Sequence, residues 1–137
     1  MALTHLLDTS VLTRLNHSTV RSAVEPLAAA GEAARAGISD LEIEFSARNA
    51  TEWDQLTSAL TVFDLVETTA RHIQRARTIQ RQLASTSQRG RRIPDLLVAA
   101  AAEEAGLTVL HYDTDFDLIS AVTAQACEWV TPPGTIS

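Results

Sequence analysis

LTHLLDTS at residues 3–10 is the most informative segment for the fold, because an apolar run changes to polar residues within a few positions. Residues 3–7 predict a short buried strand, and Asp8, Thr9 and Ser10 are all good N-caps for a following helix. Strands that alternate with helices are typical of a parallel α/β sheet. We therefore expect Asp8 at the carboxyl end of the first strand, which is the edge where such sheets bind ligands.

The same alternation continues along the chain. Further strands are predicted at 36–39, 62–67 and 107–111, with an edge strand at 128–130, and helices at 19–30, 40–48, 52–60, 68–84, 95–104 and 115–126. Thr68 or Thr69 is expected to open the fourth of these helices, and Gly106 to end the fifth. The pattern predicts a single three-layer α/β domain over residues 1–137, with a central, mainly parallel sheet.

Length and composition indicate an ordinary globular protein. The chain has 137 residues, of which 45% are hydrophobic and 20% are charged. The single cysteine, Cys127, cannot form an intramolecular disulfide, which favours a reducing compartment. No run approaches the ~20 apolar residues that a membrane helix requires. We therefore expect a cytoplasmic protein with no membrane partner.

Charge is distributed very unevenly. The net charge is -6, and all eleven basic residues are arginines. Seven of them lie between Glu67 and Asp95 with no acid among them: Arg71, Arg75, Arg77, Arg81, Arg89, Arg91 and Arg92. Exposed helices usually carry charges of mixed sign, so this segment is a candidate surface for an anionic partner in spite of the negative total.

Separated acidic residues suggest a metal site. Besides Asp8, the candidates are Glu42, Asp95, Asp113 and Asp115, most of which lie where an apolar run ends or a helix begins. Carboxylates gathered at one sheet edge repel one another unless a divalent cation lies among them. Each acid also has a structural explanation, as an N-cap or as a first-turn acid that interacts with the helix dipole.

Other residue types carry less information about function. The four histidines show no mutual spacing and are interpreted as incidental. Trp53 and Trp129 are expected to be core or interface residues rather than stacking platforms.

Four segments together resemble a known family. They are LLDTSVL at 6–12, LEIEFSAR at 41–48, RRIPDLLVAAAA at 91–102 and VLHYDTDFDLIS at 109–120, followed by WVTPPGTI. In this order they resemble the PIN domain, and more closely the VapC-type toxin ribonucleases of bacterial toxin-antitoxin pairs. The resemblance covers almost the whole chain, and it implies an α/β/α fold, dependence on Mg²⁺ or Mn²⁺, and hydrolysis of RNA.

The resemblance also implies roles for individual residues. Its acidic positions map onto Asp8, Glu42, Asp95, Asp113 and Asp115. Asp8, Asp95 and Asp113 would be metal ligands, and Glu42 and Asp115 would orient the attacking water, with the nearby Glu44 an alternative to Glu42. Ser10, Arg89, Arg91 and Arg92 would contact the substrate, since arginine binds phosphate well.

Partners follow from the same resemblance. It implies a VapB-type antitoxin that covers the site, a homodimer, and a structured RNA substrate such as transfer or ribosomal RNA. The alternative is a non-catalytic PIN-like module that binds RNA or a protein, with acids that serve only as caps. The complete set of acids favours the enzyme.

Overall fold

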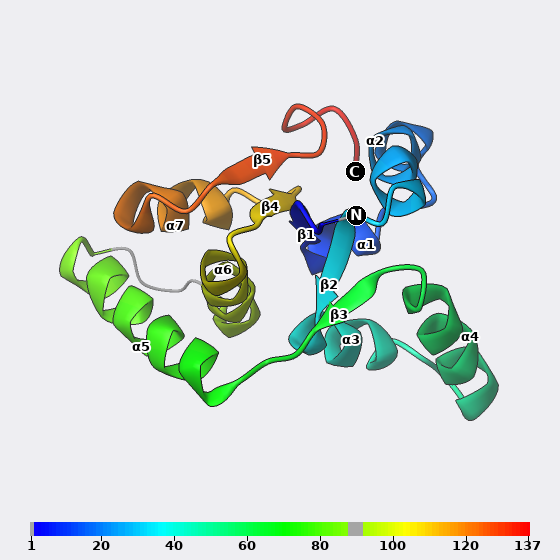
Figure 1. Ribbon diagram of the computed structural model, residues 1–137, viewed down its shortest axis with the longest axis horizontal. Helices are drawn as coiled ribbons and strands as arrows, with labels where there is room; N and C mark the ends of the chain where they lie inside the picture. The colour runs from blue at the N-terminus through cyan, green and yellow to red at the C-terminus, as the bar shows by residue number, and fades with distance from the viewer. Residues whose placement is uncertain (1, 88–91) are drawn as a thin grey trace.

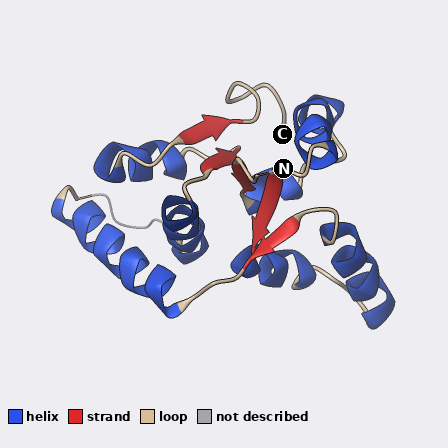
Figure 2. Cartoon of the chain, viewed as in Figure 1, coloured by secondary structure: helices blue, strands red, loops and turns tan. Residues whose placement is uncertain are grey.

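The computed structural model describes residues 2–87 and 92–137, and it contains a central sheet of five parallel strands. The strands are β1 (His5–Leu7), β2 (Ala33–Ala36), β3 (Asp64–Val66), β4 (Thr108–His111) and β5 (Cys127–Trp129), in the order β3-β2-β1-β4-β5 (Figures 1 and 2). Every neighbouring pair is parallel, which confirms the predicted sheet.

Helices cover both faces of the sheet (Figure 1). They are α1 (Thr9–Leu12), α2 (Ser18–Ala29), α3 (Gly37–Glu44), α4 (Ala50–Leu60), α5 (Ala70–Ser85), α6 (Ile93–Ala105) and α7 (Asp115–Thr123). Successive side chains of a strand point to opposite faces. Leu6 accordingly belongs to the core beneath α5, α6 and α7, whereas Leu7 belongs to the core beneath α1, α2 and α3. This arrangement confirms the three-layer α/β/α architecture. No helix in the described parts of the chain is long and apolar enough to cross a membrane.

The strand order places the ends of two distant segments side by side. The chain builds outward from β1 to β3 and then returns to β4 on the other side of β1. Leu7 is in register with Leu110, and the N–H of Asp8 donates to the carbonyl oxygen of Leu110 at 2.9 Å. The point where strand order reverses is the usual binding crevice of an open parallel sheet. The residues that follow β1 and β4 meet there.

The strand predicted at 36–39 is wrong. The structure places β2 at Ala33–Ala36, and Gly37 is the first residue of α3. Its alanines are small, so the segment lacks the β-branched residues that mark a strand. The tertiary structure supports Arg35 inside this strand, because its Nε donates to Asp40 Oδ1 at 2.9 Å and its Nη1 donates to the carbonyl oxygens of Leu60 and Phe63.

Helix ends agree better with the sequence where capping residues mark them. Thr69 caps α5: its Oγ1 accepts from the N–H of His72, and its own N–H donates to His72 Nδ1, both at 3.3 Å. His72, interpreted as incidental, thus completes a capping box. Gly106 ends α6 with a φ of 70°, as expected of a left-handed C-cap. Helices α3 and α7 end at Glu44 and Thr123, earlier than predicted.

Candidate metal centre

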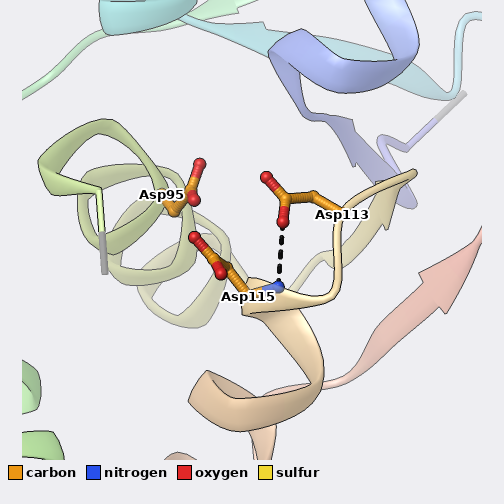
Figure 3. Close-up of side chains that lie close together, drawn as sticks. All are labelled: Asp95, Asp113 and Asp115. Carbon is orange, nitrogen blue, oxygen red and sulfur yellow. Dashed lines mark hydrogen bonds between the residues drawn. The ribbon is translucent and has the colours of Figure 1, made fainter. Parts of the chain in front are cut away.

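Three carboxylates meet at the carboxyl edge of the sheet. Asp95 lies in the first turn of α6, Asp113 follows β4, and Asp115 is the first residue of α7. One oxygen from each lies within 4.8 Å of the others. Figure 3 shows the three side chains directed into a shared space, with the N–H of Asp115 donating to Asp113 Oδ1 at 2.9 Å. Oxygen ligands at this spacing suit Mg²⁺ or Mn²⁺.

Asp95 has the most unusual environment of the three. Its side chain is 1% exposed, and no hydrogen-bond donor in the described part of the chain reaches its Oδ2. The pKa of Asp95 is raised to about 8, first by burial and then by the charge of Asp8 and a side-chain hydrogen bond with Asp115. A buried carboxylate of this kind retains a proton near neutral pH unless a cation compensates its charge. This group of carboxylate ligands therefore fits a divalent ion.

Asp8 lies beside this group but outside its tight spacing. Its Oδ2 accepts from the N–H of Ser10 at 3.0 Å and from Ser10 Oγ at 2.6 Å. Burial raises the pKa of Asp8, whereas the two bonds from Ser10 lower it. Ser10 Oγ also accepts from the N–H of Tyr112 at 2.9 Å, so one hydroxyl links the ends of β1 and β4. Asp8 is thus an N-cap of α1 and a member of the acidic edge at once.

Glu42 and Glu44 point to different parts of the molecule. Thr9 Oγ1 donates to Glu42 Oε1 at 2.7 Å and lies 2.8 Å from Ser39 Oγ, which brings Glu42 to the side of Asp8. Glu44 instead accepts from Thr57 Oγ1 of α4 at 2.5 Å. Of the two candidates for the second acid, the fold directs Glu42 toward the site and Glu44 away from it.

Arg92 contacts the acids directly. Its Nη2 donates to Asp113 Oδ2 at 3.1 Å and to Asp95 Oδ1 at 3.4 Å. The charge of Asp95 is the main reason that the pKa of Arg92 is raised. Arg89 and Arg91, also predicted to contact substrate, lie outside the described residues. Arg92 is therefore a counter-ion of the carboxylates.

Sequence reasoning missed two residues that shape the site. Thr9 holds Glu42, and the only hint was its position next to Asp8. His111, interpreted as incidental, is fully buried, and its Nδ1 accepts from the N–H of Asp113 at 3.3 Å. Burial lowers the pKa of His111, which keeps the ring neutral. No spacing in the sequence indicates this contact, because it depends on how the chain turns after β4.

Comparison with known proteins agrees with this geometry. A family model described as the PIN domain matches residues 5–122, and the chain belongs to that family. Within the family it belongs to the VapC-type ribonucleases. It is 65% identical over 136 residues to Ribonuclease VapC51 of Mycobacterium tuberculosis (strain ATCC 25618 / H37Rv), covering 99% of each chain. Ribonuclease VapC21 of the same strain is 42% identical over 137 residues, covering 98% of this chain and 99% of that one.

Solved structures show the same fold at low sequence identity. VapBC2 from Rickettsia felis, bound to a DNA fragment from its promoter, gives a TM-score of 0.77 at 16% identity, over 94% of this chain and 98% of that chain. VapBC-1 from nontypeable Haemophilus influenzae gives a TM-score of 0.74 at 14% identity, over 95% and 98%. Fold and family were therefore predicted correctly from the sequence.

Proposed function

We propose that this protein is a metal-dependent endoribonuclease, the toxin of a type II toxin-antitoxin pair, which hydrolyses phosphodiester bonds of RNA. One observation carries the proposal: Asp95, Asp113 and Asp115 gather their oxygens within 4.8 Å at the binding edge of the sheet, and Asp95 Oδ2 is buried with no donor among the described residues. The relatives named as ribonucleases, one of them 65% identical, support it.

The cofactor is Mg²⁺ or Mn²⁺, held by Asp95 and Asp113 with Asp115 and Asp8 beside them. When bound, such an ion makes water a better nucleophile and compensates charge on the phosphate oxygens. Asp113 is positioned for this by two backbone contacts, because its N–H donates to His111 and its Oδ1 accepts from the N–H of Asp115. The chain thus contributes a rigid set of hard ligands.

Asp8 and Glu42 flank the attacking water, Asp8 as a metal ligand and Glu42, together with Asp115, as a residue that orients the water. Each is held by a hydroxyl of the first turn of α1, Asp8 by Ser10 and Glu42 by Thr9. A carboxylate with a fixed orientation can accept a proton from water and direct the oxygen at the phosphorus. Ser10 consequently acts through Asp8 and the backbone of Tyr112, rather than as a free substrate ligand.

Arginines provide the substrate contacts. Arg92 lies at the edge of the carboxylates, and Arg89 and Arg91 precede it in the sequence. We assign them to phosphates beside the scissile bond, since a guanidinium binds phosphate through two parallel hydrogen bonds. The substrate class is structured RNA, such as transfer or ribosomal RNA.

The partner is a VapB-type antitoxin that silences the enzyme by covering this edge, and the toxin is a homodimer. The structural neighbours described as VapBC complexes support the pairing. A non-catalytic module with the same fold would bind RNA or a protein through its arginines without cleaving anything.

The test compares purified wild type with Asp95→Asn, which removes the charge at nearly constant shape. With Mn²⁺ and total cellular RNA, wild type should give discrete fragments, and Asp95→Asn should be slower by at least about 100-fold, since metal stabilisation amounts to several kcal/mol. Expression without antitoxin should arrest growth with wild type but not with Asp95→Asn. Asp54→Asn, on the exposed face of α4, is the matched control and should behave as wild type.

Two results would contradict the proposal. Wild type that cuts no RNA with Mn²⁺ or Mg²⁺ present, while folded by circular dichroism, would favour the non-catalytic module. Equal cleavage by wild type and Asp95→Asn would assign the activity to a contaminant.

A further inference from the structure

A cavity of about 670 Å³ opens beside the acidic edge. Its lining includes Thr13 and Arg14 at the end of α1, Asp113 and Thr114 before α7, and Trp129 and Gly134 in the C-terminal part of the chain. The volume lies within the range of about 300 to 1,000 Å³ that is usual for small-ligand sites.

The cavity is continuous with the candidate metal centre. Asp113 contributes to both, and Arg92, which binds Asp113 and Asp95, also lines the cavity. A phosphodiester held at the carboxylates must carry one nucleotide on each side. The cavity is the adjoining space in which one of these nucleotides can lie.

One wall of the cavity is held by contacts with the C-terminal segment. Arg14 donates from Nη1 to the carbonyl oxygen of Ser10 at 2.7 Å and from Nε to that of Ser137 at 2.9 Å, and its guanidinium lies 5.0 Å from the centre of the Tyr112 ring. The Tyr112 hydroxyl accepts from the N–H of Gly134 at 2.9 Å and donates to the carbonyl oxygen of Ile136 at 2.8 Å. These contacts hold one wall in place, so a ligand meets a preformed site.

The lining combines an aromatic ring with polar groups. Trp129 is held by its neighbours: its ring centre lies 4.9 Å from that of His111 and 5.5 Å from that of Tyr112, and its Nε1 donates to Asp117 Oδ1 at 3.1 Å. Thr13 and Thr114 are exposed nearby, and the Thr13 hydroxyl, which donates to the carbonyl oxygen of Thr9 at 3.0 Å, can still accept a hydrogen bond. Unpaired RNA bases are recognised by this combination of a fixed aromatic surface and hydrogen-bonding groups.

We propose that this cavity binds one of the two nucleotides that flank the scissile phosphodiester, with its base against Trp129, and so selects where the RNA is cut. The inference rests on the proposed ribonuclease activity and deepens it. It also gives Trp129 a role beyond the core or interface position expected from the sequence.

The experiment makes two changes, separately and together: a base is removed from the RNA, and the cavity is blocked by a larger side chain. The bond that wild type cuts is first mapped in cellular RNA, and a stem-loop oligonucleotide with this bond is made with an abasic nucleotide on either side of it. For wild type, one of the two abasic changes should lower kcat/KM by roughly 5- to 150-fold, the loss expected for one base–aromatic contact. Thr13→Trp should cut the intact oligonucleotide slowly and lose nothing further with the abasic one.

Three further measurements make the test specific. Thr51→Trp, an exposed threonine of α4, should keep the full wild-type dependence on the base. Trp129→Leu should lose that dependence while the cavity stays open. In a Trp53→Phe background without metal, the intact oligonucleotide should quench Trp129 fluorescence, and the abasic one should not.

The outcomes separate the two proposals. Wild type that cuts no RNA overturns both. RNA cleavage that is insensitive to either abasic change, or base dependence that survives in Thr13→Trp, overturns the cavity assignment alone. If Thr13→Trp keeps its base dependence but is no longer inhibited by the antitoxin, the cavity binds the partner protein rather than a nucleotide. This result also overturns the cavity assignment.

Discussion

Acidic residues of the same chemical type have different environments at this sheet edge. Asp8 accepts two hydrogen bonds from Ser10, and Glu42 accepts one from Thr9. No donor among the described residues reaches Asp95 Oδ2. A carboxylate oxygen already bound to donors is a weaker ligand than one with none, because those bonds must be given up or shared. Asp95 is therefore the residue whose charge most requires a cation.

Glu42→Gln and Glu44→Gln form a matched pair at neighbouring helical positions. We expect Glu42→Gln to lower kcat for RNA by about 10- to 100-fold, since groups that orient the reacting water or the metal ligands typically have effects of this size. Glu44→Gln should stay close to wild type, because Glu44 bonds to Thr57 of α4. Steady-state cleavage of one mapped oligonucleotide measures both. A larger loss for Glu44→Gln would assign the second acid to that residue.

Arg92 should compete with the metal. Its guanidinium, bound to Asp113 and Asp95, compensates the same charge that an ion would. Arg92→Ala should raise Mn²⁺ affinity by about 2- to 5-fold, the effect of removing a partly exposed ion pair, and should weaken RNA binding. Calorimetric titration with Mn²⁺ and fluorescence anisotropy with RNA separate the two effects. Arg92→Lys, which keeps the charge, should show a smaller change in both, and a fall in Mn²⁺ affinity on Arg92→Ala would refute the competition.

Helices and strands were predicted well where local chemistry marks them and poorly elsewhere. Thr69 and Gly106 bound their helices as the sequence indicates, because capping is a local interaction. The prediction placed strand β2 wrongly, because only pairing with neighbouring strands marks its alanines as a strand.

In α5, Arg75 pairs with Glu103 at 2.7 Å and Arg71 approaches Glu104 to 3.9 Å. Tertiary packing against α6 thus partly neutralises a segment that has no acid in sequence.

Gly106→Ala tests the end of α6. Gly106 has a φ of 70°, a conformation that costs an alanine about 1 kcal/mol, although nothing lies within 4 Å of the added Cβ. We expect a loss of about 1 kcal/mol in the free energy of unfolding, measured with urea. Gly37→Ala is the control: it begins α3 without a positive φ, and its Cβ would meet Thr68 Oγ1 at an ordinary 3.5 Å. Equal losses in both variants would exclude backbone conformation as the cause.

At the scale of the whole molecule, the topology concentrates negative charge at one edge. Asp8 follows β1, Asp113 follows β4 and Asp95 lies in the first turn of α6, and the fold brings these distant segments together at one edge of the sheet. Burial and mutual repulsion raise the pKa of Asp8 and that of Asp95. Ionisation of these carboxyls is therefore unfavourable, and the proposed divalent cation would compensate the charge.

The stability of the metal-free protein should depend on pH in a direction set by Asp95. Because its pKa is about 8 in the native state against 3.8 ordinarily, the native state holds a proton that the unfolded chain releases. Stability should thus fall as pH rises between these two values, with a limiting slope of about 1.4 kcal/mol per pH unit. Urea unfolding with a chelator present, at several pH values, measures the slope.

Asp95→Asn should flatten this slope, and Asp54→Asn, its exposed counterpart on α4, should leave it unchanged. Added Mg²⁺ or Mn²⁺ should stabilise wild type more at high pH than at low pH, because the ion then displaces fewer protons. Metal-free stability that rises with pH over this window in wild type relative to Asp95→Asn would show that Asp95 is ionised without metal.

Local sequence patterns were enough to predict the architecture and to name the acidic residues as candidates for the site. Alternating apolar runs and capped helices specify parallel strands, and an acid placed just after a strand such as β1 or β4 must lie at its carboxyl edge. The neighbours of each acid, in contrast, depend on how distant segments pack. The tertiary structure directed Glu42 to Thr9 and Glu44 to Thr57, and it placed Arg92 on Asp95 and Asp113. It also formed the cavity beside Trp129. Backbone periodicity is local and can be seen in a sequence, whereas contacts between side chains of distant segments depend on packing.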